Sequence, residues 1–226
     1  MKPIAHIHTD FKTKFGLPRQ SGLVKEITGK IIFEKEYSIA EAFKGLEDFS
    51  HIWLLWEFSE AKKESWKPTV RPPLLGGNKR MGVFATRSPF RPNSIGLSCV
   101  RLEKIDYEPE YGTVLYVSGC DIMNGTPIYD IKPYLAYCDS IPEAKGGFTE
   151  SLGERRLEVI ISEDFLNRVP KEKRSELLGV LQGDPRPSYQ NDPEREYGFS
   201  FAEYEIGFKV DGEKLTVTRI EKNIKK

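Results

Sequence analysis

Long apolar runs are missing from this chain of 226 residues. The longest, Ile52 to Trp56, is far shorter than the roughly 20 residues that a membrane-spanning helix needs. The first residues of the chain reach the polar side chains of His6 and His8 at once. We therefore expect no signal peptide and no membrane association.

Cysteine is scarce as well. The three cysteines, Cys99, Cys120 and Cys138, are an odd number and show no CxxC spacing. This usage argues against a disulfide framework and favours a cytoplasmic location. None of the three has a histidine partner of the kind that activates a nucleophilic thiol, which argues against cysteine catalysis.

Histidine is equally rare, with three in the chain. His6 and His8 are two residues apart, so on a strand both point to one face, as metal-binding pairs do. A zinc or binuclear site needs more ligands, and His51 is the only other histidine, so we predict no metal. The turn at 118–121 is followed by no GxGxxG motif and no evident helix, which argues against a Rossmann-type cofactor site.

Net charge is absent, since 34 basic residues balance 34 acidic ones. The distribution is nevertheless uneven, because the window 62–91 holds eight basic residues and a single acidic one, Glu64. Such a window can bind phosphates in a neutral protein, because salt screens charges beyond roughly 8 Å. A solvated loop is the alternative interpretation. The basic residues are Lys62, Lys63, Lys67, Arg71, Lys79, Arg80, Arg87 and Arg91.

The first 145 residues do contain many segments rich in β-branched and aromatic residues. Many strands with few helices favour a mainly β fold, a barrel or a sandwich, over a parallel α/β sheet. One helix is expected after Ser38, which forms a capping box with Glu41 ahead of an apolar face. The expected strands are Ile4–Thr9, Leu23–Phe33, His51–Phe58, Met81–Thr86, Ile95–Ile105 and Thr113–Ser118.

Glycine and proline in Ile141–Gly153 predict a linker. It separates a first domain, 1–145, from a small α+β domain, 146–226. The second domain should close with a hairpin across Asp211-Gly212. Its expected elements are a strand at Arg155–Ser162, a helix at about Lys171–Gln182, a turn at 184–187, and hairpin strands at Tyr204–Val210 and Leu215–Ile220.

Two loop segments are hard to explain as scaffolding. In the segment 15–24, Arg19 and Gln20 stand between a proline and a glycine. They form a fork of hydrogen-bonding groups suited to a carboxylate, a phosphate or a base edge. In the segment 82–97, a proline-stiffened loop offers two guanidinium groups, an aromatic ring and an amide. That set suits a flat, charged ligand such as a nucleotide or an adenosyl cofactor.

A third segment, 119–134, carries Asp130, Lys132 and Tyr134 at alternate positions. On an extended backbone these side chains share one face. A carboxylate, an ammonium and a phenol there could tune one another for proton transfer. A surface ion pair beside a packed tyrosine explains the pattern equally well.

Together these segments resemble the TsaA-like, or TrmO, family of tRNA methyltransferases. The resemblance covers most of residues 1–140. It rests on GVFATRSPFRPN followed by IGLS, on NGTP followed by DIKPY, and on a further likeness at DPRPSY, which begins at Asp184. Two departures are Ser94, where the family commonly has proline, and Asn124, where aspartate is common.

The resemblance implies a β-barrel with a site for S-adenosyl-L-methionine and a homodimer with sites near the subunit interface. The implied reaction is methyl transfer to N6 of N6-threonylcarbamoyladenosine at tRNA position 37, in the anticodon stem-loop. Asp121 would meet the cofactor's hydroxyls or ammonium, and Leu97 would pack against adenine. The implied cofactor-binding residues are Arg19, Gln20, Ser59, Glu60, Arg87, Leu97, Cys120 and Asp121, with Ser59 and Glu60 at variable positions.

For catalysis we expect Asp130, oriented by Lys132, to accept the proton of the methylated nitrogen. Tyr134 would stack on, or hydrogen-bond to, the modified base. Two other functions remain open: a non-catalytic RNA- or nucleotide-binding barrel, and a small-molecule methyltransferase. The expected RNA contacts are Lys79, Arg80 and Arg91 to phosphates, with Phe90 or Trp66 stacking on a splayed base.

Overall fold

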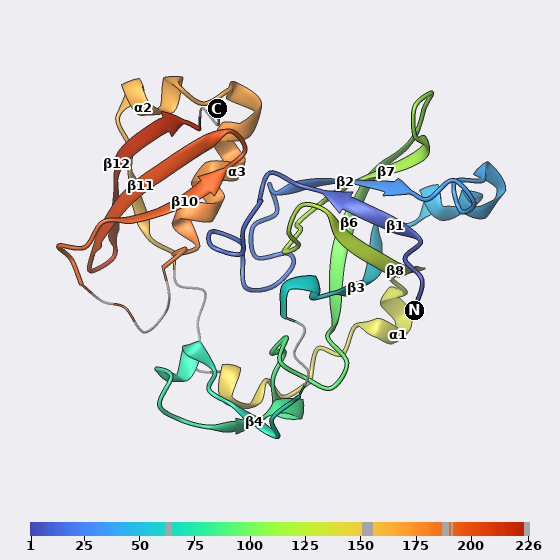
Figure 1. The fold of residues 1–226 in the computed structure, drawn as a ribbon, viewed down its shortest axis with the longest axis horizontal. Coiled ribbons are helices and arrows are strands. Elements are labelled where there is room, and N and C mark those ends of the chain that lie inside the picture. The colour runs from blue at the N-terminus through green and yellow to red at the C-terminus, as the bar shows by residue number, and fades with distance from the viewer. Residues whose placement is uncertain (62–64, 151–155, 187–189, 191, 224–226) are drawn as a thin grey trace.

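The computed structural model of the chain describes residues 1–61, 65–150, 156–186, 190 and 192–223. Six antiparallel strands close into a barrel in the order β1-β2-β7-β6-β3-β8, which confirms the mainly β fold (Figure 1). The barrel strands are β1 (Ala5–His8), β2 (Thr28–Phe33), β3 (His51–Glu57), β6 (Ile95–Glu108), β7 (Gly112–Ser118) and β8 (Thr126–Pro133).

Alternation of side chains along β3 shows how the barrel fills its interior. Ile52, Leu54 and Trp56 are buried, whereas the residues between them are partly exposed. Trp56 pairs with Gly96 on β6. A Cβ atom added to Gly96 would collide with the indole ring of Trp56. Glycine at this position therefore gives the large ring its space inside the barrel.

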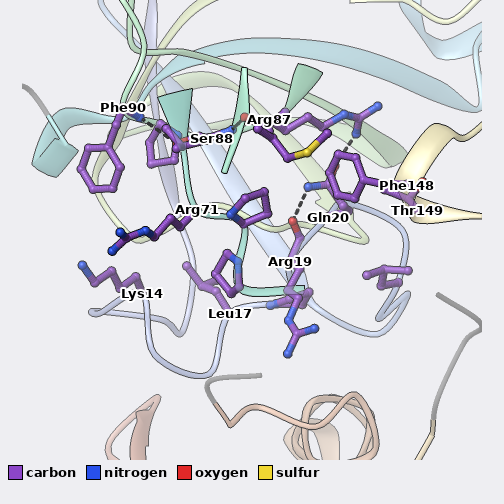
Figure 2. A pocket seen from close by; sticks show the side chains of 18 of the residues that line it. Lys14, Leu17, Arg19, Gln20, Arg71, Arg87, Ser88, Phe90, Phe148 and Thr149 are labelled. Carbon is purple, nitrogen blue, oxygen red and sulfur yellow. Dashed lines mark hydrogen bonds between the residues drawn. The ribbon is translucent and has the colours of Figure 1, made fainter. Parts of the chain in front are cut away.

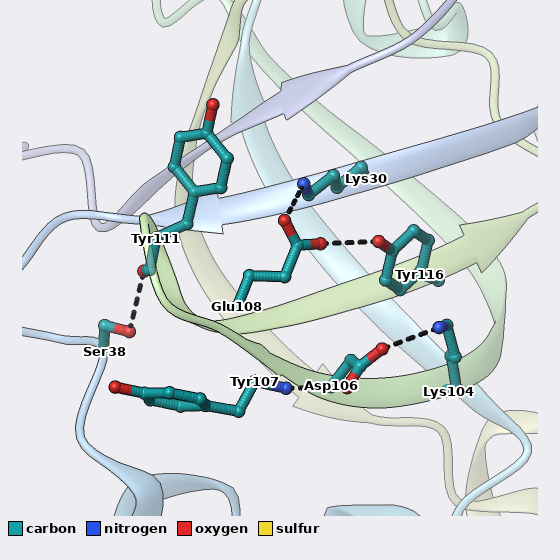
Figure 3. Close-up of polar contacts among 8 residues, drawn as sticks. All are labelled: Lys30, Ser38, Lys104, Asp106, Tyr107, Glu108, Tyr111 and Tyr116. Atoms are coloured by element: carbon teal, nitrogen blue, oxygen red, sulfur yellow. Dashed lines mark hydrogen bonds and ion pairs between the residues drawn. The ribbon is translucent and has the colours of Figure 1, made fainter.

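A polar network closes the hairpin between β6 and β7 (Figure 3). Glu108 accepts hydrogen bonds of 2.5 Å from both Lys30 on β2 and Tyr116 on β7. These two bonds hold the pKa of Glu108 below its ordinary value. The Lys30 ammonium also lies 4.5 Å from the centre of the Tyr111 ring. The network joins three strands and has a structural role.

The prediction of a helix after Ser38 is wrong. Two short 3₁₀ turns, Ala40–Phe43 and Leu46–Asp48, take its place, and Gly45 between them has a φ of 86°. No side chain caps the first turn. Instead, the hydroxyl of Ser38 accepts a 2.8 Å hydrogen bond from the backbone N–H of Thr113. A tertiary contact with the β6–β7 hairpin thus replaces the local cap.

Two expected strands are shorter than predicted. The segment 23–33 is strand only from Thr28, because Leu23–Ile27 forms turns. The segment 81–86 forms a short hairpin, in which β5 (Met81–Gly82) pairs with β4 (Thr69–Val70). It then continues as a 3₁₀ turn. Other short elements are 3₁₀ turns at Ser59–Ala61, Pro73–Leu75, Val83–Ala85 and Gly147–Thr149, and helix α1 (Ala136–Asp139).

The C-terminal part is a four-stranded sheet in the order β10-β11-β12-β9, with two helices packed beside it (Figure 1). The prediction of a helix at Lys171–Gln182 is confirmed, since α3 begins and ends at these residues. The hairpin is confirmed too, with Gly212 and Glu213 as its two loop residues. The first strand is shorter than expected, and Arg155 lies outside the described residues. The elements are β9 (Glu158–Ile160), α2 (Glu163–Asn167), α3 (Lys171–Gln182), β10 (Tyr197–Phe201), β11 (Tyr204–Asp211) and β12 (Lys214–Lys222).

Helix α3 packs against the barrel, and one hydrophobic cluster includes residues of both parts. Lys173 forms an ion pair with Asp10, and the backbone N–H of Ala202 donates a 2.9 Å hydrogen bond to the carbonyl of Asp10. Glu176 is buried beside this pair, and burial raises its pKa to about 8. The two parts are therefore held together by polar and apolar contacts.

Candidate functional site

A large cleft lies where the loops of the barrel meet the C-terminal part (Figure 2). Its volume is about 2490 Å³, whereas typical small-molecule pockets measure roughly 300–1,000 Å³. The cleft therefore has room for more than a small cofactor. Its walls come from the segments 14–24, 65–92, 145–149 and 183–186 and from the tip of the C-terminal hairpin.

Positive charge dominates this cleft. Among the described residues that line it, ten are basic and two, Asp184 and Asp211, are acidic. Asp184 is already bound by the guanidinium of Arg186 through contacts of 2.8 and 2.9 Å. A surface of this kind attracts the phosphates of a nucleic acid. The basic residues are Lys14, Arg19, Lys67, Arg71, Arg80, Arg87, Arg91, Lys145, Arg156 and Arg186.

Of the three basic residues expected to contact RNA phosphates, two line the cleft. Arg80 and Arg91 line the cleft, whereas Lys79 is not among its lining residues. The Nε atom of Arg80 donates a 2.9 Å hydrogen bond to Oγ1 of Thr69, across the β4–β5 hairpin. Lys62 and Lys63 lie outside the described residues.

Of the four cofactor residues predicted in the segments 15–24 and 82–97, Arg19, Gln20 and Arg87 come together in the cleft, and Leu97 does not line it. Figure 2 shows Arg87 donating a hydrogen bond to the side-chain oxygen of Gln20, whose amide donates to the carbonyl of Arg19. The guanidinium of Arg19 reaches the carbonyl of Arg186 in the C-terminal part at 3.4 Å. The ring of Phe148 points toward the Gln20–Arg87 pair (Figure 2). This group presents further N–H donors to an anionic ligand.

Asp121 stands at the end of a chain of hydrogen bonds that starts inside the barrel. The Nε1 atom of Trp56 donates to Oγ of Ser98 at 2.9 Å, and that hydroxyl donates to Oδ1 of Asp121 at 2.6 Å. Burial raises the pKa of Asp121, while the Ser98 hydrogen bond and the charge of Arg87 oppose that rise. Asp121 is thus electrostatically coupled to the Arg87 group.

Cys120 has a different environment from its neighbour Asp121. Its side chain is fully buried in the hydrophobic cluster, and burial raises the pKa of its thiol. Cys120 is therefore closed to a ligand, and neither Cys120 nor Asp121 is among the lining residues of the cleft. Ser59 and Glu60 form an exposed 3₁₀ turn after β3 and are not among the lining residues of the cleft.

The remaining predicted residues lie on the outer face of the barrel. Strand register pairs Leu97 with Leu55, and Leu55 with Asp130. These three positions form one row across β6, β3 and β8. Leu97 is 54% exposed. Since neighbouring strands are about 4.8 Å apart, Leu97 and Asp130 are separated by about two strand spacings.

Lys132 and Asp130 form an ion pair of 3.0 Å on this outer face, and both side chains are substantially exposed. Tyr134 follows the end of β8 and packs beside Trp53, with ring centres 5.8 Å apart. The predicted trio is thus assembled as an ion pair beside a packed aromatic residue. Exposed pairs of this kind contribute little to stability, so the fold does not depend on them.

Sequence reasoning missed several residues of the site. Ser98 and Trp56, which support Asp121, are buried polar groups on strands, and the signal for Ser98 was a polar residue at an inward-facing position. Ser21 was missed too, although its hydroxyl accepts a 3.1 Å hydrogen bond from the backbone of Cys99. Phe148 stood within the expected linker, where no local pattern marked it.

No metal site emerges in the described part of the chain, where no group of three or more histidine, cysteine or acidic residues is clustered. His6 lies on β1, with its Nδ1 atom 3.2 Å from a carboxylate oxygen of Glu34. Among the described residues, no helix has the length and apolar character to cross a membrane.

A closed barrel with a basic cleft, in which Arg19, Gln20 and Arg87 form a hydrogen-bonded group, defines a class of β-barrel proteins with a site suited to anionic ligands. Within that class, the chain belongs to the tRNA-methyltransferase O (TrmO) family. The model of its N-terminal domain matches residues 6–140, and the model of the TrmO C-terminal domain matches residues 154–223.

Relatives support this membership over the whole chain. A tRNA (adenine(37)-N6)-methyltransferase of Escherichia coli is 38% identical, with 96% of each chain covered. A protein of the same description from Eikenella corrodens is 43% identical and covers 72% of this chain and 92% of its own length. The crystal structure of TrmO from Pseudomonas aeruginosa superposes with a TM-score of 0.77, at 31% identity and 97% coverage of both chains.

Proposed function

We propose that this protein transfers the methyl group of S-adenosyl-L-methionine to N6 of an adenosine in tRNA. We further propose that the acceptor is N6-threonylcarbamoyladenosine at position 37 of the anticodon loop, and that the protein acts in the cytoplasm. The observation that carries the proposal is the basic cleft continuous with the Arg19–Gln20–Arg87 group. RNA phosphates and a small charged cofactor can be held there side by side.

The residues of this group fit the cofactor. The carboxylate of S-adenosyl-L-methionine can accept hydrogen bonds from Arg87 and Gln20, because a guanidinium binds carboxylates with several N–H groups. Asp121 provides an acceptor for a ribose hydroxyl or for the ammonium group. When bound, the cofactor supplies a methyl group on a positively charged sulfur, which is a strong electrophile.

The acceptor nitrogen is a poor nucleophile, because its lone pair is delocalised into the purine and the carbonyl group. Removing or sharing its proton therefore assists the reaction. Asp130, held by Lys132 at 3.0 Å, is the proposed proton acceptor, and such a group contributes typically ~10²–10⁴-fold to the rate. Alignment of the methyl group with the nitrogen supplies much of the remaining acceleration.

The outer face that carries Asp130 also supports a homodimer. Leu97, Tyr137 and Ile141 are all exposed, and helix α1 is tied to this face by a 2.9 Å hydrogen bond from Trp53 to Asp139. Exposed apolar side chains of this kind favour a protein interface. We propose that a second copy covers them and that the Asp130 side of the site lies near the interface. Leu97→Asp should then yield monomers in sedimentation experiments.

A methyl-transfer assay tests the proposal and separates it from the alternatives. The purified protein is given labelled cofactor and tRNA from cells that lack it, and the nucleosides are then analysed by mass spectrometry. New label on N6 of the threonylcarbamoyl adenosine supports the proposal. Cofactor binding without transfer to any tRNA would indicate a binding module, and transfer to metabolites alone would indicate a small-molecule enzyme.

A further inference from the structure

Two aromatic rings that the sequence places far apart meet on the β4–β5 hairpin. Thr69 pairs with Gly82, and the backbone N–H of Val83 donates a 2.9 Å hydrogen bond to the carbonyl of Pro68. These contacts hold the two segments together, and Trp66 lies beside Phe84, which belongs to the 3₁₀ turn after β5. Their ring centres are 6.1 Å apart, with an angle of 34° between the ring planes. The two rings therefore form a tilted aromatic pair.

Both rings are open to solvent. Phe84 is 74% exposed and Trp66 is 48% exposed. A phenylalanine has no polar atom to hydrate, so an exposed pair of large rings leaves apolar surface in water at a cost to stability. Their mutual contact restricts the motion of each ring. Less conformational entropy is therefore lost when a flat ligand binds.

The surroundings of the pair identify what kind of ligand fits. Trp66 and Phe84 line the basic cleft together with Lys67, Arg71 and Arg80. Lys67 directly follows Trp66 in the chain, and Thr69 orients the guanidinium of Arg80 through a 2.9 Å hydrogen bond. Exposed aromatic rings between cations are the arrangement that binds single-stranded nucleic acid, because the bases stack while the phosphates meet positive charge.

We propose that Trp66 and Phe84 form a stacking platform for one unpaired nucleobase of the RNA, a base other than the methylated adenosine. This inference rests on the proposed function, since it names how the substrate loop is held. The purine ring of the cofactor has the same stacking chemistry. The RNA base is favoured because three cations flank the platform, as a chain of phosphates requires and a cofactor with one carboxylate does not.

Removing one ring tests the platform. Phe84→Leu keeps an apolar side chain but removes the stacking surface, and we expect it to weaken binding of an anticodon stem-loop by on the order of tenfold. The slope of affinity against salt should stay unchanged, because no phosphate contact is lost. Phe84→Tyr retains a ring and should bind like the original protein.

Tyr107→Leu is the matched control. Tyr107 is 71% exposed on β6 and is not among the lining residues of the cleft, so its loss should leave stem-loop affinity unaltered. Cofactor affinity is measured by calorimetry on each variant. A Phe84→Leu protein that loses cofactor affinity but keeps RNA affinity would assign the platform to the cofactor and overturn the inference. Unchanged RNA affinity in Phe84→Leu, or equal loss in Phe84→Tyr, would also overturn it.

A fluorescent base locates the stacked position without relying on variants. Stem-loops carrying 2-aminopurine at one loop position at a time are titrated with the original protein. Stacking on a ring quenches this base, so we expect one position to be quenched and the quenching to be relieved in Phe84→Leu. The absence of any protein-dependent quenching at every position would refute the platform. These readouts measure binding alone, so they stay distinct from a failure of methyl transfer.

Discussion

The hydroxyl of Ser98 donates a 2.6 Å hydrogen bond to Asp121 while it accepts a 2.9 Å hydrogen bond from the indole N–H of Trp56. Ser98 and Trp56 are both buried in the barrel. Their positions are set by β3–β6 register, and Gly96 makes space for the indole ring. The barrel interior thus orients a carboxylate that interacts electrostatically with Arg87, a residue of the cleft.

Ser98→Ala should weaken cofactor binding about tenfold or more, since a hydrogen bond to a charged group contributes roughly 1.5–3 kcal/mol. Without this donor the pKa of Asp121 rises further, so the pH at which binding reaches half its maximum should move upward. Calorimetry across a pH series measures both effects. Ser118→Ala is the control, because Ser118 is also buried on the barrel but donates to Glu103 instead. Equal pH profiles for the original protein and Ser98→Ala would contradict this role.

Two neighbouring cations, Lys79 and Arg80, provide a test of the cleft. Arg80→Ala should weaken tRNA binding and reduce the log–log salt slope by roughly 0.7–0.9, the value for one lost phosphate contact. Lys79→Ala should leave the slope unchanged, because Lys79 is not among the lining residues of the cleft. Filter binding at several salt concentrations measures both. Equal salt slopes for Arg80→Ala and Lys79→Ala would contradict the prediction that RNA phosphates bind in the cleft.

Asp130→Asn should keep the fold and the cofactor affinity but lower the single-turnover methylation rate at least tenfold. The loss should ease as pH rises, if hydroxide or water can replace the missing proton acceptor. Rapid-quench measurements on the stem-loop give the rate, and thermal melting checks the fold. A structural aspartate would instead lower the melting temperature and the cofactor affinity together. A fully active variant that is indifferent to pH would leave alignment as the main source of catalysis.

The raised pKa of Glu176 predicts how the stability of the fold depends on pH. Burial raises its pKa in the folded chain from the ordinary value of 4.5 to about 8. Between these values the folded state holds a proton that the unfolded state has released, so the free energy of unfolding falls as pH rises, by up to about 1.4 kcal/mol per unit. The stability that comes from the extra proton on Glu176 is fully present below pH 4.5 and is lost above about pH 8.

Glu176→Gln should remove this slope, and urea unfolding at pH 5, 6, 7 and 8 measures it. The control is Glu172→Gln, an exposed glutamate on the same helix, which should keep the slope of the original protein. A Glu176→Gln chain whose stability still falls with pH as before would show that another group titrates in this window.

Much of the fold was predictable because its patterns are local. Segments rich in β-branched and aromatic residues marked five of the six barrel strands, β8 being the exception, and helix α3 was predicted at Lys171–Gln182. Asp211-Gly212 marked the closing hairpin to within one residue. The failure at Ser38 has a physical reason. Its hydroxyl found a partner on a hairpin distant in the sequence, and Gly45 interrupted the helix that the pattern favoured.

The sequence by itself also determined the family signatures, and with them the loops that carry Arg19, Gln20 and Arg87. Only the tertiary structure decided how these residues are used. Strand register placed Leu97 and Asp130 on the outer face and Ser98 inside, and packing buried the sulfur of Cys120 in the core. The meeting of Trp66 with Phe84 likewise depends on contacts between the two segments. Spacing along a chain fixes which side chains share a face, but contacts between distant segments are set by packing and closure of the barrel.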